Sequence, residues 1–210
     1  MQRRRFHRWG LGAVGALGLT GLGWPSGSAR AATVGQPAPS FELADTEGRT
    51  RRLTDFRGQP VVLEWTNPGC PFVRKHYQGN MQGLQADAQA RGVAWLTVNS
   101  TEDGSADYMA PPQLARWMRE RQARPTAVLM DEDGKVGRAY AARVTPHMYL
   151  IDAQGMLVYA GAIDSIPSAR VADIERATNH VRQAMDELLA GKPLSIGRTQ
   201  AYGCSIKYKL

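Results

Sequence analysis

Apolar and polar positions along the chain predict strands separated by helices. Continuous apolar runs rich in β-branched residues are typical of buried strands, and they occur at 61–65, 93–99 and 126–130. Two pairs of shorter apolar runs, each separated by a turn sequence, predict hairpins: 41–43 with 50–53, and 147–152 with 157–163.

Between these strands, apolar residues recur at helical spacing. They predict helices over about 71–90, 112–121, 136–142 and 169–189. The last stretch, 192–210, shows no periodicity, so we expect a flexible tail without regular structure. Strands and helices therefore alternate until a hairpin and a final helix close the chain. This order predicts an α/β protein with a mixed central sheet flanked by helices on both faces.

The first 31 residues differ from the rest and predict an export signal. Arg3-Arg4-Arg5-Phe6 resembles a twin-arginine signal, a glycine-rich apolar run follows, and Ala29-Arg30-Ala31 forms a small-x-small cleavage site. We expect 1–31 to be a twin-arginine-type signal peptide and 32–210 one mature domain, periplasmic or secreted. An uncleaved membrane anchor is the alternative. The mature part has no apolar run long enough to span a bilayer, so we expect no stable membrane insertion after cleavage.

The net charge of +7 comes mainly from the same segment. Five of the 26 basic residues and none of the 19 acidic ones lie within 1–31, which leaves 21 basic against 19 acidic residues. That near balance gives no support to a nucleic-acid partner. The sequence also has no glycine-rich loop opening a helix after a strand, and no His-Glu-x-x-His motif. We therefore expect neither a cofactor nor a metal.

Cys70 lies where the buried strand at 61–65 gives way to a helix. Pro71 occupies the first helical position, where its missing N–H costs nothing. The unpaired N–H groups and the positive end of the helix dipole favour the thiolate, which is the reactive form of cysteine. Basic side chains at 74–76 would strengthen this effect if they faced the sulfur. The alternative is an inert, half-buried cysteine with those side chains merely solvated.

Three stretches carry a family resemblance: 38–43 with Gly48 and Leu53, 58–71, and Val144-Thr145-Pro146 before a strand. They resemble the thioredoxin-like redoxins of the alkyl hydroperoxide reductase/thiol-specific antioxidant superfamily, over most of 34–165. The likeness is closest to a peroxiredoxin-like branch with an Asn-Pro-x-Cys-Pro-Phe-Val site, here 67–73, and a Tyr-Gly-Cys-Ser-x-Lys-Tyr tail, here 202–208. The resemblance implies a thioredoxin-like fold and thiol redox chemistry.

The site departs from two patterns of that superfamily. Thioredoxins place a second cysteine three residues after the first, where this chain has Val73. Peroxiredoxins place their peroxide-reacting cysteine at the position of Val73, with a threonine where this chain has Cys70. Because neither pattern is intact, we expect weak peroxide reduction at best.

The resemblance also assigns roles to Pro146 and His147. Thr145-Pro146 matches the cis-proline that lies against the active cysteine in thioredoxin-like folds. This match would bring His147 near Cys70, where it could act as a base, a charge partner or a metal ligand. The alternative is an imidazole that is simply hydrogen-bonded within the sheet.

Cys204 is the second redox candidate. A resolving cysteine must reach an attacked sulfur and then move away, as a thiol in a flexible tail can do. The alternative is a permanent disulfide with Cys70, which would contribute roughly 5 kcal/mol in the chain-entropy model.

Three functions remain open from the sequence. The favoured one is an exported redox protein that exchanges protein thiols and disulfides, or slowly reduces small peroxides, with an unidentified electron donor. The others are a protein binding a soft metal such as Cu(I) through Cys70, His147 and Met148, and a catalytically silent redoxin-fold interaction module.

Overall fold

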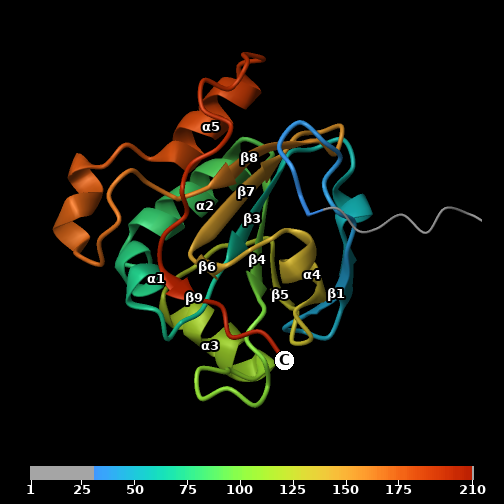
Figure 1. Cartoon of the computed structure of the whole chain (residues 1–210), viewed down its shortest axis with the longest axis vertical. Coiled ribbons are helices and arrows are strands. Elements are labelled where there is room, and N and C mark those ends of the chain that lie inside the picture. The colour runs from blue at the N-terminus through green and yellow to red at the C-terminus, as the bar shows by residue number, and fades with distance from the viewer. Residues whose placement is uncertain (1–30, 210) are drawn as a thin grey trace, which may run out of the picture.

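A seven-stranded mixed sheet forms the centre of the computed structural model, which describes residues 31–209 (Figure 1). The strand order is β2-β1-β5-β4-β3-β7-β8. The strands are β1 (Glu42–Asp45), β2 (Thr50–Arg52), β3 (Val61–Trp65), β4 (Ala94–Asn99), β5 (Ala127–Met130), β7 (His147–Ile151) and β8 (Leu157–Gly161). Strands β3, β4 and β5 are parallel, and β1 and β7 run antiparallel to their neighbours β5 and β3. The predicted mixed sheet is confirmed; the proposed signal peptide lies almost wholly outside the described residues.

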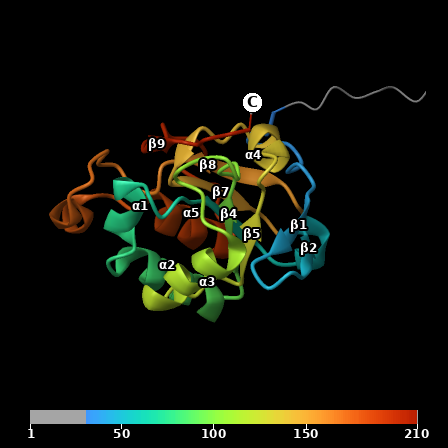
Figure 2. The same cartoon turned by 90° about the horizontal axis from the view of Figure 1, so that it is seen from below.

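Helices cover both faces of this sheet, as Figure 2 shows. They are α1 (Pro71–His76), α2 (Asn80–Ala90), α3 (Pro111–Glu120), α4 (Lys135–Ala139) and α5 (His180–Leu189), with 3-10 turns η1 (Leu53–Phe56) and η2 (Val171–Arg176). One face packs against the long helices α2, α3 and α5 and against the short α1, whereas α4 and the N-terminal segment cover the other. The α/β layering therefore follows the sequence prediction.

Two of the predicted helices are broken in the structure. The helix expected over 71–90 divides into α1 and α2 at Gly79, whose φ of 118° is a backbone conformation that favours glycine. The helix expected over 169–189 divides into η2 and α5. The Asn179 side chain accepts the backbone N–H of Arg182 at 2.9 Å and so starts α5 afresh.

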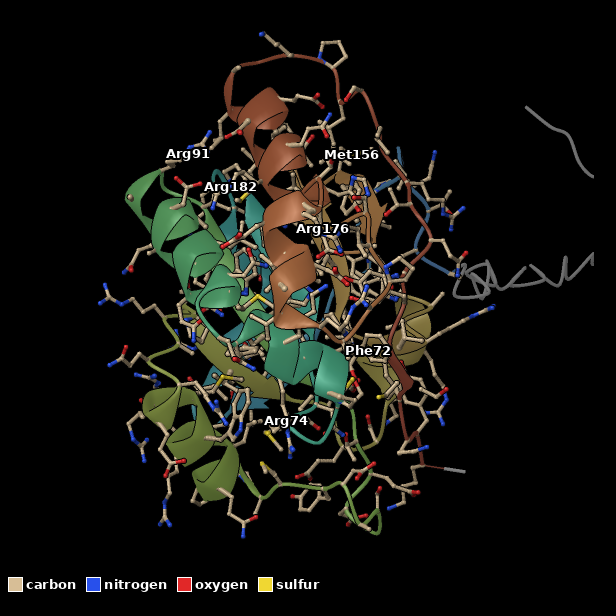
Figure 3. The ribbon with its side chains drawn as sticks, turned by 90° about the vertical axis from the view of Figure 1, so that its left-hand side faces the viewer. Phe72, Arg74, Arg91, Met156, Arg176 and Arg182 are labelled. Carbon is tan, nitrogen blue, oxygen red and sulfur yellow. The ribbon has the colours of Figure 1, made fainter. Side chains whose placement is uncertain are left out.

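The pair α2 and α5 lies side by side on the same face of the sheet (Figure 3). Arg91 pairs with Asp186 at 2.6 Å, and Arg182 pairs with Asp87 at 3.3 Å. These are partly exposed ion pairs, so their contribution to stability is small. Buried apolar side chains between the helices and the sheet hold the layer together.

The C-terminal tail is ordered, and the prediction of a flexible tail is wrong. Strand β9 (Cys204–Ser205) pairs with β6 (Val144–Thr145) in a separate two-stranded sheet (Figure 1). Before β9, the Thr199 hydroxyl accepts the Ala162 N–H at 2.8 Å. After β9, the Tyr208 hydroxyl donates to the Ala142 carbonyl at 2.7 Å. The residues that make these contacts are irregularly spaced along the tail, so they produce no periodic pattern in the sequence.

None of the helices found between residues 31 and 209 combines the length and apolar character needed to cross a membrane.

Candidate active site

Cys70 lies at the turn between β3 and α1. The turn is closed by Asn67, whose side-chain oxygen accepts the Gly69 N–H at 2.6 Å and whose carbonyl accepts the Cys70 N–H at 3.0 Å. Cys70 is the N-cap residue of α1, and Pro71 follows at the first helical position, as the sequence predicts. Only 2% of Cys70 is exposed, so the residue is almost completely buried in this conformation.

The Cys70 sulfur bonds to the segment that precedes β7. Its Sγ donates a hydrogen bond to the Thr145 carbonyl oxygen at 3.0 Å, and the Thr145-Pro146 peptide bond is cis. The structure thus brings Pro146 and Cys70 together, in the arrangement that the family resemblance implies. Because a carbonyl oxygen only accepts, this hydrogen bond requires a proton on the sulfur.

Cys204 occupies the same neighbourhood from the tail. It pairs with Thr145 across the β6–β9 ladder, so one residue contacts both cysteines. Both are free thiols. Burial raises the pKa of Cys204 to about 12, and so do its hydrogen bond with Cys70 and repulsion from the charges of Cys70 and Asp107. The structure therefore places two free thiols next to each other.

His147 does not join this site. Successive strand residues point to opposite faces of a sheet, and Met148 packs in the same core as Cys70. The His147 ring lies instead against Tyr149 on the opposite face, with 4.6 Å between ring centroids and 3.1 Å between Nδ1 and the Tyr149 hydroxyl. Burial and the nearby Arg143 and Arg198 lower the pKa of His147 to about 4. The expectation that it would lie beside Cys70 is wrong.

This placement also weakens the soft-metal hypothesis, since Cys70 and His147 lie on opposite faces of the sheet. Within residues 31–209, no group of three or more His, Cys, Asp or Glu side chains is arranged to hold a metal ion.

The basic residues that follow Cys70 have other partners. Arg74 donates through Nε to the Pro68 carbonyl at 2.6 Å. Lys75 is buried and bonds to Asp164 at 3.2 Å, and His76 lies 3.3 Å from the Tyr202 hydroxyl. No sequence pattern pointed to Asp164, and Tyr202 was recognisable only as part of the tail motif.

A second buried acid lies in β3, facing Tyr77 after α1 and Gln85 of α2. Glu64 is fully buried in β3, and its carboxylate accepts hydrogen bonds from the Tyr77 hydroxyl at 2.8 Å and from Trp95 Nε1 at 2.8 Å. The Thr97 hydroxyl adds a third at 3.2 Å. Burial raises the pKa of Glu64 despite these donors. Nothing in the sequence marks this residue, because an acid inside an apolar run carries no spacing signal.

The fold, the cis-proline and the cysteine at the start of α1 define a thioredoxin-like redoxin. A family model described as the AhpC/TSA family matches residues 34–160, which is more than half of the chain. The protein therefore belongs to the AhpC/TSA family.

Two similar proteins are named for thiol-disulfide chemistry. The chain is 33% identical over 125 residues to the thiol-disulfide oxidoreductase ResA of Geobacillus thermodenitrificans, covering 60% of this chain and 67% of the relative. It is 26% identical over 137 residues to the thiol:disulfide interchange protein DsbE of Pseudomonas aeruginosa, covering 63% and 69%. Among solved structures, an uncharacterized conserved protein from Geobacillus kaustophilus matches with a TM-score of 0.73 and 29% identity, covering 84% of this chain and 93% of that one.

Proposed function

We propose that this protein is an exported thiol-disulfide oxidoreductase in which Cys70 attacks the substrate disulfide and Cys204 resolves the intermediate. One observation carries the proposal. Thr145 accepts the hydrogen bond of the Cys70 sulfur at 3.0 Å and pairs with Cys204 across the β6–β9 ladder. Both cysteines are free thiols, and both are linked to Thr145, the residue before the cis-proline. Together they form a dithiol that can close to a disulfide. The names of the relatives support the same chemistry.

The reaction transfers two electrons in two exchanges. Cys70 loses its proton and attacks one sulfur of an external disulfide, which forms a mixed disulfide and releases the other sulfur as a thiol. Cys204 then loses its proton and attacks the Cys70 sulfur, which forms the Cys70–Cys204 disulfide and releases the second substrate thiol. A dithiol donor must return two electrons for the next cycle.

The surroundings of Cys204 fit the second exchange. Part of its raised pKa comes from the Cys70 sulfur, through the hydrogen bond and through like-charge repulsion. In the mixed disulfide the Cys70 sulfur cannot become a thiolate, so no charge on Cys70 opposes the loss of the Cys204 proton at the step in which Cys204 attacks.

A glutathione redox titration separates this cycle from a permanent structural disulfide. We expect Cys70 and Cys204 to form a disulfide with a reduction potential above about −300 mV, because structural disulfides lie below that value. Incubated with a small disulfide, Cys204→Ser should accumulate a mixed disulfide on Cys70, detected by intact mass, whereas Cys70→Ser should accumulate none.

Thermal melts of the oxidised protein and of both variants test the alternative, a permanent structural disulfide. A potential below about −300 mV, with a large and equal loss of stability in the two variants, would show a structural disulfide and reject the redox cycle. If no disulfide forms under any glutathione ratio, the resolving role of Cys204 is rejected.

Export is tested separately. The twin-arginine-like start and the cleavage site at 29–31 support a mature protein that begins at Ala32. In a host with a twin-arginine pathway, we expect intact-mass analysis of the periplasmic fraction to show loss of residues 1–31. The matched control carries Arg3→Lys, Arg4→Lys and Arg5→Lys, and it should stay in the cytoplasm. Unprocessed wild-type protein found only in the cytoplasm would contradict export.

A further inference from the structure

A buried polar cluster joins the helix that follows Cys70 to the tail that carries Cys204. It consists of Lys75 and His76 from α1, Asp164 after β8, and Tyr202 from the tail. We call these four residues the latch. None of them takes part in the exchange steps, and buried charge is costly unless it is paired, so the cluster calls for an explanation.

The centre of the latch is Asp164. Its carboxylate accepts a hydrogen bond from the Tyr202 hydroxyl and pairs with Lys75 Nζ at 3.2 Å. The side chains of Lys75 and Asp164 are 0% and 2% exposed. The Lys75 ammonium also lies 5.8 Å from the centre of the Tyr202 ring, within the range of a cation–π contact. Tyr202 is therefore held by both of its chemical parts, the hydroxyl and the ring.

His76 completes the hydrogen bonding around the tyrosine. Its Nδ1 lies 2.8 Å from the Asn80 amide nitrogen, which donates, so Nδ1 accepts and the ring proton is on Nε2. Nε2 then donates to the Tyr202 hydroxyl at 3.3 Å, and the hydroxyl donates to Asp164. Burial lowers the pKa of His76 to about 4, so this neutral form persists at neutral pH.

The position of the latch connects the two cysteines. Tyr202 precedes Cys204 by two residues, and α1 begins directly after Cys70. Phe72, on the side of α1 toward the tail in Figure 3, packs edge-to-face on the Tyr202 ring with centroids 5.7 Å apart. In this arrangement β9 is paired with β6 and Cys70 is only 2% exposed.

We propose that Tyr202 and Asp164 are positioning residues that hold the tail closed over Cys70. The closed tail keeps Cys204 at high effective concentration beside Cys70, and it shields Cys70 from external thiols and disulfides. Opening of the latch is then the step that admits a substrate. The effect on Cys204 rests on the proposed function, whereas the shielding of Cys70 does not.

Tyr202→Phe tests the latch with little disturbance, because it removes the hydroxyl and keeps the ring on Phe72 and Lys75. In a Cys204→Ser background, where Cys70 is the remaining thiol, we expect iodoacetamide to alkylate Cys70 about tenfold faster. Tyr208→Phe is the matched control. It removes the other half-buried tyrosine hydroxyl of the tail, bound to the Ala142 carbonyl, and should change the rate less than twofold.

The protein with both cysteines gives the second readout. We expect Tyr202→Phe to lower the equilibrium constant for closing the Cys70–Cys204 disulfide about tenfold in a glutathione titration, or about 30 mV for a two-electron couple. Tyr208→Phe should leave it unchanged.

The outcomes separate the latch from the proposed function. The latch is rejected if Cys70 is alkylated in Tyr202→Phe at the rate of the Cys204→Ser parent, or no faster than in Tyr208→Phe. This holds even where the disulfide forms normally. If alkylation accelerates as expected but no Cys70–Cys204 disulfide ever forms, the shielding role stands and the resolving role of Cys204 is rejected.

Discussion

Gly203→Ala is expected to release the tail from the active site. Gly203 has a φ of 141°, and a Cβ at this position would lie 1.9 Å from the Thr145 carbonyl oxygen. The Cβ and the carbonyl oxygen are both fixed by the backbone, so no side-chain rotation removes the overlap. We therefore expect β9 to leave β6. We expect iodoacetamide to alkylate Cys70 at least tenfold faster, and the equilibrium constant for closing the Cys70–Cys204 disulfide to fall at least tenfold.

Gly191→Ala is the matched control for backbone strain. Gly191 also has a positive φ, 67°, but a Cβ there would meet no atom within 4 Å. It should lose about 1 kcal/mol of stability and keep the alkylation rate of the parent. If Gly203→Ala behaved like Gly191→Ala, the close approach of the tail to Thr145 would not control access to Cys70.

The sheet was predictable because each strand carries its own signal. The runs at 61–65, 93–99 and 126–130 are apolar on both faces, as expected for central parallel strands, and they became β3, β4 and β5. The cysteine at the start of α1 was predictable for the same reason, since the strand, the turn and Pro71 are adjacent in sequence.

The errors arose where long-range contacts decide the structure. The helix periodicity over 71–90 continues across Gly79, and only the packing of the folded chain shows that the helix stops there. The tail has no periodicity, yet Thr199 and Tyr208 anchor it to distant segments. Tyr202 meets Asp164 across 38 residues, so neither residue carries a local signal for the contact.

The position of His147 could have been predicted better. Met148 and Leu150 alternate with His147 and Tyr149 along β7, and side chains alternate between faces. Cys70 belongs to the same core cluster as Met148, so the neighbouring His147 points to the opposite face. Proximity along the chain to a cis-proline does not bring a side chain to the same face of the sheet.

The other large expected effect concerns Glu64. In Glu64→Leu, the carboxylate that accepts from Tyr77, Trp95, Thr97 and Gln85 is lost. These donors are then left without their acceptor in a fully buried place. A buried donor without a partner costs about 1–3 kcal/mol. We therefore expect the free energy of unfolding, measured in urea, to fall by about 3–5 kcal/mol.

Glu64→Gln separates hydrogen bonding from charge. The glutamine oxygen can accept from Trp95 and Thr97, while its NH2 group donates to the Tyr77 hydroxyl, which also accepts. The variant keeps the acceptor for Trp95 and Thr97 and cannot ionise, whereas the Tyr77 O–H loses its acceptor. A loss as large as that of Glu64→Leu would contradict this account, because the two variants differ mainly in their hydrogen bonds.

The pH dependence of the glutamine variant tests the ionisation of Glu64. Burial raises the pKa of Glu64 in the folded protein above its ordinary value of 4.5, so the folded state keeps a proton that the unfolded state releases. The stabilising contribution of the protonated acid is complete below about pH 4.5 and declines as the pH rises toward the folded pKa. Glutamine has no such titration. The stability of Glu64→Gln relative to the wild type should therefore increase between pH 4.5 and pH 8 in urea unfolding, and a difference that stays constant with pH would show that Glu64 titrates at its ordinary pKa.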